Sequence, residues 1–542
     1  MNSESAENDN LTTSSSMSAP IEMKRTRPLL GFILMAVGMF MALLDTQILG
    51  SSLHEVQAGL SATPEEISLV QTSYLIAEVI MIPLAAWFSS ILSTRVLFTL
   101  SCAGFTLASL GCGFAWDIQS MMLFRGLQGF LGGAMIPTAF ASGFMMFPGE
   151  KNQAKIAAVL GLMATLAPVL GPSIGAVITD SLSWRWLFFI NVVPGILVCV
   201  AVALVVHIDH ADWSVARRFD YLGAGSLAIF LGFLQYVLDE GPRRLWMEDQ
   251  SLLLMLVISI VAAVFFVWRS LTYRFPIVHL PAFAHLPFSI GCALSFVVGI
   301  GLYGSIYMTP LFLGLVRHYS ALQIGMTVFV TGIFQVLATF LSIALRKRIS
   351  NQSILALGFG IFLLSCILFR DVTAEWGYWE LLLPQALRGM GTMLCVIPLT
   401  SLALGSFSGE VLKGASGIYN LMRNLGGAIG LALINTELFY ARFDLHYRQL
   451  LDHAATASTS VGRASDQLLP LLSGRIVDTE RAGLAAHKML DLAMRREALV
   501  LSFSDVYALM AIAFSIGIAL ITVLRVRTKT TSSTESTIEA HA

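Results

Sequence analysis

The sequence predicts an all-α polytopic membrane protein, and three observations lead to this fold class. First, 56% of the 542 residues are hydrophobic and only 12% are charged, whereas about a quarter of a soluble globular chain is charged. Second, the charges gather in short gaps between long apolar runs, and a helix needs about 20 apolar residues to cross a bilayer. Third, the runs are continuously apolar, whereas the strands of a membrane β-barrel alternate.

Fourteen runs meet the length criterion. Six precede Asp209, two follow it, and six more begin at about Pro287. The predicted membrane helices span 29–50, 67–88, 95–115, 120–146, 156–179, 186–206, 221–238, 251–269, 287–313, 321–345, 353–369, 380–404, 414–438 and 502–524.

The segments between and beyond the runs predict the orientation. Residues 1–20 are rich in Ser, Asn and Glu, and the end of the chain after Lys529 is rich in Thr, Ser and Glu. These compositions predict disorder in the N-terminal tail 1–28 and at the C-terminal end. Lys and Arg concentrate in the short segments that are predicted to lie on the same side of the membrane as the N-terminus. Basic residues favour the cytoplasmic side, so both termini are predicted to be cytoplasmic in a multi-pass protein of the inner (plasma) membrane.

Composition also argues against several classes of partner and cofactor. The net charge of −1 argues against a nucleic-acid partner. The six cysteines fall inside apolar runs without CxxC spacing, so neither a disulfide framework, a metal site nor another cofactor is predicted. The HIDH stretch at 207–210 is interpreted as a solvated loop rather than a site.

An internal duplication divides the chain. RGLQGFLGGAMIP at 125–137 is similar to LPQALRGMGTMLCVIP at 383–398. Each of the two copies is followed by a stretch with regularly spaced glycines, APVLGPSIGAVI in the first half and NLMRNLGGAIGLAL in the second. Duplicated halves with a site at their interface are typical of transporters. The predicted organisation is an N-terminal tail, a six-helix bundle, a linker with two extra helices, a second six-helix bundle that includes a long periplasmic loop, and a tail: 1–28, 29–208, 209–286, 287–526 with the loop at 440–500, and 527–542.

Four longer stretches carry a resemblance to a known family. They are MALLDTQILGSSL, RGLQGFLGGAMIP, LAPVLGPSIGAVITDSLSWRWLFFINVVPG and FDYLGAGSLAIFLGFLQYVLDEG. With them the chain resembles the fourteen-helix drug:proton antiporters of the major facilitator superfamily, most closely the EmrB-like efflux permeases. The resemblance implies two six-helix bundles with two inserted helices, and the last stretch resembles the inserted pair. Gly50, His54, Ala86, Ser93 and Ala176 depart from the family pattern.

Three ionisable residues inside the runs are the candidates for proton coupling. Asp45, Glu78 and Arg125 lie within predicted membrane helices, where a charge costs at least about 2.5–3.5 kcal/mol. A carboxyl that changes its protonation state can exchange a proton for a substrate, and a permanently charged arginine can tune that exchange. Other interpretations stay open: Asp45 at a helix end in water, Glu78 in a structural hydrogen bond, and Arg125 snorkelling to the headgroups.

Further polar and small residues are candidates for substrate binding and for a hinge. Gln71 and Tyr74 share a helical face with Glu78, and Gln128 shares one with Arg125. The predicted substrate-binding residues are Gln71, Tyr74, Gln128, Asn420 and Arg423. Gly171, Pro172 and Gly175 predict a bent or broken, closely packed hinge, and the resemblance associates this motif with exporters.

The functional hypothesis is a secondary exporter of hydrophobic drugs or other small toxic compounds that is driven by proton antiport. An importer on the same scaffold and a carrier of one endogenous metabolite or siderophore remain alternatives. An enzyme is not predicted because the sequence has no Walker loop, HExxH or nucleophile elbow. The resemblance implies a periplasmic membrane-fusion adaptor and an outer-membrane channel as partners, and 440–500 is either a solvated cap or the docking surface.

Overall fold

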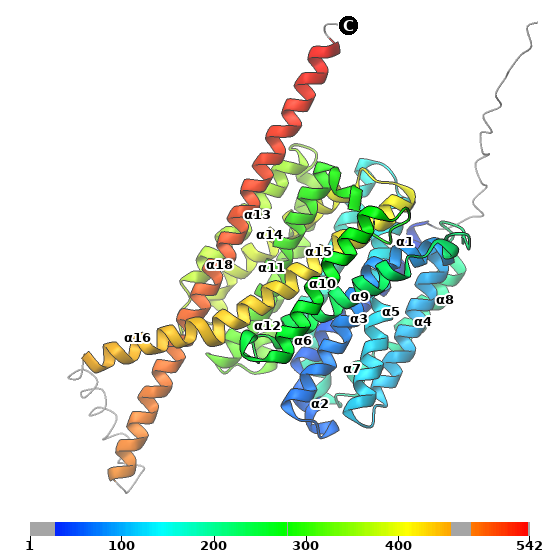
Figure 1. Cartoon of the computed structure of the whole chain (residues 1–542). Coiled ribbons are helices and arrows are strands. Elements are labelled where there is room, and N and C mark those ends of the chain that lie inside the picture. Colours follow the sequence, from blue (N-terminus) through cyan, green and yellow to red (C-terminus); the bar gives the residue numbers. More distant parts are fainter. Residues whose placement is uncertain (1–27, 279, 457–478, 540–542) are drawn as a thin grey trace, which may run out of the picture.

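The computed structural model describes residues 28–278, 280–456 and 479–539, and all regular structure in these ranges is helical (Figure 1). The α-helices are α1 Pro28–Ile48, α2 Leu53–Leu60, α3 Pro64–Leu92, α4 Thr94–Gly113, α5 Ile118–Met146, α6 Glu150–Ser181, α7 Trp186–Phe189, α8 Val192–Val205, α9 Tyr221–Glu240, α10 Gln250–Thr272, α11 Leu286–Leu315, α12 Ala321–Leu345, α13 Asn351–Arg370, α14 Tyr378–Leu404, α15 Gly409–Thr436, α16 Arg442–Thr456 and α18 Thr479–Glu539. The short helices are η1 Leu49–Ser51, η2 Val215–Arg218, η3 Trp246–Glu248, η4 Leu280–Ala284 and the π-helix η5 Glu437–Ala441.

The fourteen predicted runs all fall on helices, which confirms the polytopic helical fold. Within the described residues, 13 helical segments are long and apolar enough to cross a membrane. The remaining predicted run, 414–438, lies on α15, whose Lys413, Asn420 and Arg423 are buried in the bundle. The run 186–206 is one of these segments, although a turn at Ile190 and Asn191 interrupts the helix between α7 and α8.

The internal duplication is visible in how the helices pack. α5 packs on α3 through Gly129, where an added Cβ would lie 2.2 Å from the Tyr74 carbonyl oxygen. In the second half α14 packs on α12 through Gly389, where an added Cβ would lie 2.4 Å from the Thr331 carbonyl oxygen. Small residues let helix backbones approach closely in membranes, and both copies of the arginine motif use one for the same purpose.

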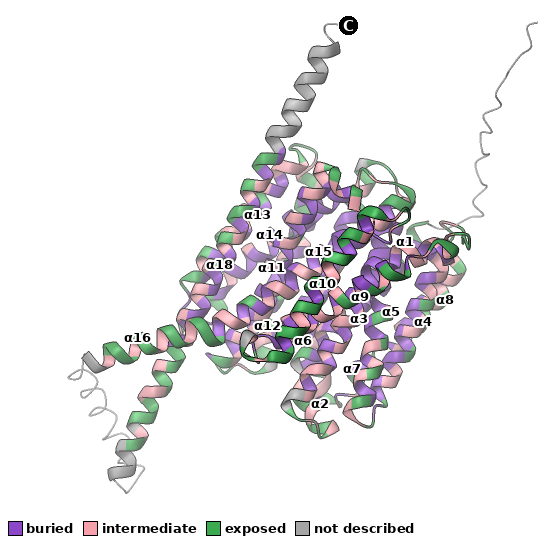
Figure 2. Cartoon of the chain, viewed as in Figure 1, coloured by how far each residue is buried: buried purple, intermediate pink, exposed green. Residues whose placement is uncertain are grey.

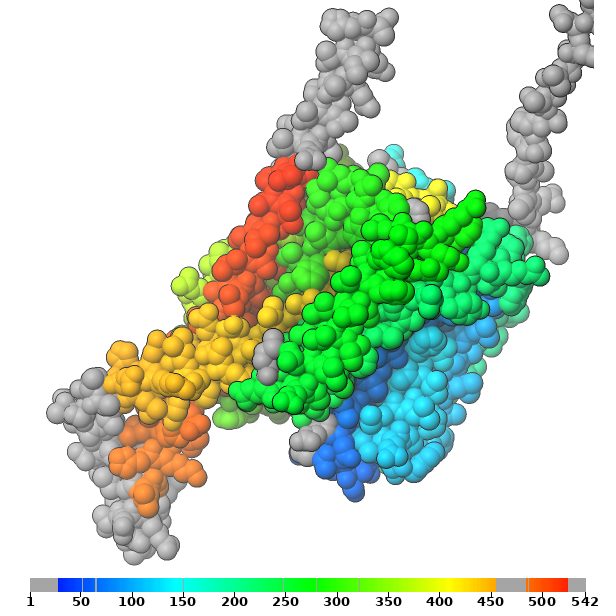
Figure 3. Space-filling view, in the orientation of Figure 1, coloured from blue at the N-terminus to red at the C-terminus, as the bar shows by residue number. Residues whose placement is uncertain are grey.

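The inserted helices α9 and α10 cross the face of the molecule between the two halves (Figures 1 and 3). α9 packs on α3 and also contacts α15, so it touches both halves. α10 packs on α9, and the face that is visible in Figure 2 is mostly exposed. Since α10 is strongly apolar, its exposed side suits contact with lipid.

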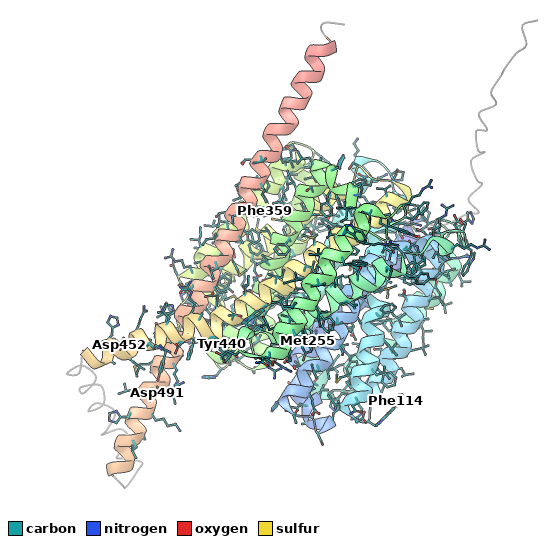
Figure 4. The ribbon with its side chains drawn as sticks, in the orientation of Figure 1. Phe114, Met255, Phe359, Tyr440, Asp452 and Asp491 are labelled. Atoms are coloured by element: carbon teal, nitrogen blue, oxygen red, sulfur yellow. The ribbon has the colours of Figure 1, made fainter. Side chains whose placement is uncertain are left out.

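The chain after α15 differs from the predicted loop and tail. α16 and the beginning of α18 leave the bundle together, with Asp452 and Asp491 on the projecting part (Figure 4). We call α16 and 479–498 of α18 the arm. From Thr479 onward the segment before the last predicted run is helical, and it is continuous with the last membrane helix.

The disorder predicted after Lys529 is wrong up to Glu539, because α18 continues to that residue. A helix that is already formed gains one hydrogen bond for each residue it adds, so extension is favourable once the apolar part is fixed. The predictions for 1–27, for 457–478 and for 540–542 lie outside the described residues.

The two halves are joined at the end of the bundle where α1 begins, which we call the start end; the opposite end, near the arm, is the arm end. Lys413 Nζ of α15 lies 2.8 Å from Asp209 Oδ2, and Asp209 in turn accepts from Thr94 Oγ1 at 2.6 Å. Glu410 also pairs with Lys413 at 2.8 Å and accepts from Ser90 of α3. The HIDH stretch therefore contributes Asp209 to a junction between the halves, although it was interpreted as a solvated loop.

Candidate functional site

A buried ion pair lies at the centre of the first half. Arg125 Nη1 of α5 is 2.6 Å from Asp45 Oδ2 of α1, and both side chains are fully buried. The pair therefore excludes two interpretations that the sequence left open, since Asp45 does not face water and Arg125 does not reach the headgroups. Removing two charges from water is costly unless they are paired and hydrogen-bonded.

Neutral polar groups complete the surroundings of this pair. Arg125 Nη1 also donates to Gln128 Oε1 at 2.8 Å, and Asn191 Nδ2 donates to Asp45 Oδ1 at 2.6 Å. Gln128 and Asn191 both donate to the hydroxyl of Ser109, at 3.1 and 3.2 Å. Both oxygens of the Asp45 carboxylate are thus held, and the arginine is fixed against it.

Asn191 was not among the predicted site residues. It stands at the break between α7 and α8, where the chain direction lets its side chain reach Asp45. The signal was present in the sequence as a single amide inside the apolar stretch WLFFINVVPG, followed by Pro194. Proline near a helix start marks a new helix, and it would have indicated the break.

Arg125 is also covered by α3. Its guanidinium carbon lies 4.3 Å from the centre of the Tyr74 ring, and its Nη2 donates to Gln71 Oε1 at 3.4 Å. The Tyr74 hydroxyl donates to the Ala42 carbonyl at 3.2 Å, which ties α3 to α1. Arg125 Nε has no hydrogen-bond partner among the described residues, so the arginine is held by its two terminal nitrogens and by the aromatic face.

The glycines of α5 set the distance between the pair and α3. An added Cβ at Gly133 would lie 2.7 Å from the Glu78 carbonyl oxygen, and one at Gly132 would lie 3.1 Å from the Tyr74 hydroxyl. Together with Gly129, these glycines let α3 lie directly against α5. This close packing positions Tyr74 and Glu78 beside α5.

Glu78 is buried, with 5% of its surface exposed. Among the described residues its carboxyl has neither a hydrogen bond nor an ion pair, although the positive charges of Arg125 and Arg423 act on it. The structural hydrogen bond considered for Glu78 is therefore not found in that part of the chain. A carboxyl without a fixed partner is free to change its protonation state or to meet a ligand.

A cavity of about 230 Å³ lies beside Glu78 and is lined by both halves and by the inserted pair. Its polar lining includes Gln71 and Glu78 of α3, Gln235 and Asp239 of α9, and Tyr303 and Asn424 of α11 and α15; its apolar lining includes Leu43, Leu75, Val79 and Leu431. Thr46 and Asp239 lie in the last turns of α1 and α9, so the cavity is in the half of the bundle nearer the arm end.

The second half has a buried arginine, Arg388, at the position that corresponds to Arg125, but its surroundings differ. Arg388 of α14 is buried and donates to the Ser305 carbonyl at 2.8 Å, to Thr309 Oγ1 at 2.7 Å and to Thr331 Oγ1 at 2.7 Å. In the described part of the chain no carboxylate pairs with it. The duplicated motif is therefore an ion pair in one half and, in the other, an arginine that donates to uncharged acceptors.

The predicted hinge lies in α6. An added Cβ at Gly171 would lie 2.6 Å from Gln47 Cβ of α1, close to the end of that helix. α6 remains one α-helix through Pro168 and Pro172, so the predicted break does not occur, while the close packing at Gly171 does. The Gly175 carbonyl accepts from Thr179 Oγ1 at 2.9 Å.

The structure thus separates the predicted site residues into groups. Asp45, Arg125, Gln128 and Tyr74 belong to the buried cluster, and Gln71 belongs to both the cluster and the cavity lining. Arg423 Nη2 donates to Asn420 Oδ1 at 2.7 Å, and both of these residues are buried in α15. Sequence reasoning missed Gln235 and Asp239, although their i, i+4 spacing in FLQYVLDEG places two polar side chains on one helical face.

Known proteins share this sequence pattern and architecture. Residues 35–431 match the family described as Major Facilitator Superfamily. "Colistin resistance protein EmrB" of Acinetobacter baumannii is 42% identical over 413 residues, which cover 75% of this chain and 79% of that protein. "Multidrug export protein EmrB" of Escherichia coli K12 is 28% identical over 438 residues, which cover 79% of this chain and 85% of that protein.

A solved structure supports the fold alone. The human organic anion transporter MFSD10 (TETRAN) superposes with a TM-score of 0.55 at 13% identity, covering 90% of this chain and all of that chain.

Proposed function

Because the chain belongs to the major facilitator superfamily, among the EmrB-like multidrug efflux permeases, we propose that it exports hydrophobic drugs or other small toxic compounds across the inner membrane in exchange for protons. In this proposal Asp45, Glu78 and Arg125 couple transport to protons. The relatives named above are described as multidrug export and colistin resistance proteins, which supports export over import of a metabolite or siderophore.

The observation that carries the proposal is the position of an unpaired carboxyl beside a shared cavity. Glu78 lines a cavity that both halves enclose, and the buried Asp45–Arg125 pair lies on the other side of Gln71 and Tyr74. A substrate in this cavity and a proton on Glu78 would occupy neighbouring sites, so binding of one can displace the other. Alternating access then requires the halves 29–208 and 287–526 to rock about the cavity.

The same proposal assigns the two faces of the membrane. The start end is the cytoplasmic end, with both chain termini, and the arm end is periplasmic. The junction of Lys413, Asp209 and Glu410 holds the halves together at the start end while the cavity lies toward the arm end. This arrangement suits a carrier that is closed to the cytoplasm and ready to release its substrate outward.

The arm is the proposed contact with a membrane-fusion adaptor, through which an outer-membrane channel would be reached. Its surface carries the exposed apolar side chains of Leu451, Leu484 and Leu492, and such groups on a projecting helix suit a helical partner. The alternative is a solvated cap. Cross-linking from a cysteine introduced at Leu492 to a co-expressed membrane-fusion adaptor distinguishes the two. A solvated cap gives no cross-link above that from a cysteine at Glu55, an exposed residue of α2 outside the arm.

The proposed exchange is tested by reconstituting the purified protein in liposomes with an imposed pH gradient. Uphill movement of a hydrophobic dye should require the gradient and should stop when nigericin collapses it. Proton movement should increase when the dye is added, because the two fluxes are coupled. Dye movement that continues after the gradient has collapsed would reject proton antiport.

A further inference from the structure

The inserted helix α9 contributes a carboxyl to the wall of the cavity. Asp239 and Gln235 of α9 line the same 230 Å³ space as Glu78 and Tyr303. The inserted pair lies outside the duplication, and its sequence alone indicates only two extra membrane helices. Its position between the halves gives it a direct part in the cavity.

The two neighbouring acids at the end of α9 have very different surroundings. Glu240 is 3% exposed and is held by Arg243 at 3.1 Å and by Arg244 at 3.2 Å. Its charge is therefore balanced, and it fastens the end of α9. Asp239 accepts a hydrogen bond from Thr72 Oγ1 at 2.8 Å, and among the described residues it has no cationic partner.

The hydroxyl group that donates a hydrogen bond to Asp239 has a second acceptor nearby. The Thr72 hydroxyl has one proton, and its oxygen also lies 3.2 Å from the Ser68 carbonyl oxygen, which competes for that proton. The carboxylate of Asp239 thus has unused acceptor capacity in a space whose other lining is the Glu78 carboxyl, neutral polar groups and apolar side chains. A negative charge in such surroundings attracts a cation strongly, because little water screens it.

The other residues of the cavity fit the rest of a cationic amphiphile. Glu78 is 95% buried, lines the cavity and has no hydrogen-bond or ion-pair partner in the described ranges. Tyr303 offers an aromatic ring, and aromatic rings attract cations through their faces. Leu43, Leu75 and Leu431 provide apolar contact for a hydrophobic body.

We propose that Asp239 of the inserted helix is a specificity-determining residue that selects hydrophobic organic cations in the cavity, separately from the proton-coupling role of Glu78 and Asp45. This inference deepens the proposed function and rests on it, because it assigns a substrate class to the same cavity. It also gives the inserted pair a role: α9 adds a second carboxyl to the one that Glu78 of the first half places in this cavity.

The first test measures binding of tetraphenylphosphonium, a permanently charged hydrophobic cation, to the full-length protein in nanodiscs. Asp239→Asn should weaken binding by about tenfold, as expected for the loss of one partly screened charge pair. Asp249→Asn is the matched control. Hydrogen bonds from the side chain and backbone of Ser251 lower the pKa of Asp249 to about 2, so this substitution removes a full charge near the same end of α9 but outside the cavity.

A second control separates charge from packing. Thr72→Val removes the hydrogen bond between α3 and α9 but keeps the carboxylate, so cation binding should be kept. If Thr72→Val weakens binding as much as Asp239→Asn, the effect comes from helix packing and the proposal is wrong. Failure of the unchanged protein to bind tetraphenylphosphonium would also overturn it.

Transport distinguishes this inference from the proposed function. In liposomes, Asp239→Asn should lose gradient-driven movement of tetraphenylphosphonium while keeping movement of Nile red, an uncharged dye, and the associated proton flux. Equal loss of both substrates with loss of proton flux would make Asp239 a coupling residue and reject the specificity role. Cation binding that depends on Asp239 without any gradient-driven transport would instead refute proton antiport and leave the inference standing.

Discussion

Removing the Asp45 carboxylate tests the ion pair at the centre of the site. In Asp45→Asn, Arg125 stays buried and cannot lose its proton, so its charge is left without a counter-charge. Breaking one side of a buried pair costs roughly 3–5 kcal/mol. The neutral acceptors Gln128 and Gln71 still bind the guanidinium, so the cost should fall at the lower end of that range and the protein should still fold.

Removing the arginine of the pair instead of the acid should destabilise the protein less. In Arg125→Gln, the acid can take up a proton and remain hydrogen-bonded to Asn191, which now donates to it at 2.6 Å. The double variant Asp45→Asn/Arg125→Gln leaves no charge at the position of the pair, and neutral replacement of a whole buried pair is often close to neutral for stability. We therefore expect stability to fall in the order unchanged protein, double variant, Arg125→Gln, Asp45→Asn.

Two assays check this reasoning. Unfolding in mixed micelles by titration with sodium dodecyl sulfate measures the order of stability, and gradient-driven dye movement in liposomes measures coupling. The double variant should regain stability but not proton-coupled transport, because no ionisable group remains at the pair. An Asp45→Asn protein as stable as the unchanged one, with intact antiport, would refute both the electrostatic argument and the role of Asp45.

Three further outcomes follow from the geometry. Glu78→Gln should flatten the pH dependence of transport with little change in unfolding, because the Glu78 carboxyl has no hydrogen bond to another described residue; a pH profile like that of the unchanged protein would contradict this. Gly129→Val adds a side chain whose Cβ would lie 2.2 Å from a neighbouring backbone oxygen, so the yield of folded protein should fall sharply. Gly126→Ala should be tolerated, because among the described residues no neighbouring atom lies within 4 Å of an added Cβ. Lys413→Met breaks the pair with Asp209 and should raise amide hydrogen exchange in the first turns of α15; unchanged exchange would show that the junction does not hold the start end closed.

The membrane helices could be predicted from the sequence because hydrophobic length is a local property. Every run of apolar residues long enough for a bilayer became a helix, and the arginine motifs at 125–137 and 383–398 became corresponding helices of two halves. The predictions from sequence differ from the structure where local composition does not determine whether a helix continues. The end of α18 is polar but continues a helix that is already formed. In the run 186–206, a turn at Ile190 and Asn191 interrupts the helix.

The sequence by itself determined which ionisable residues lie inside the membrane, since a charge there is costly and stands out among apolar neighbours. It could not determine their partners. Arg125 meets Asp45, and Arg388 donates to the Ser305 carbonyl and to the hydroxyls of Thr309 and Thr331. Asp239 of an inserted helix lines the same cavity as Glu78. All of these arrangements depend on contacts between residues far apart in the chain. Tertiary structure alone decides such contacts, because the interhelical spacing set by the packed glycines fixes which side chains can reach one another.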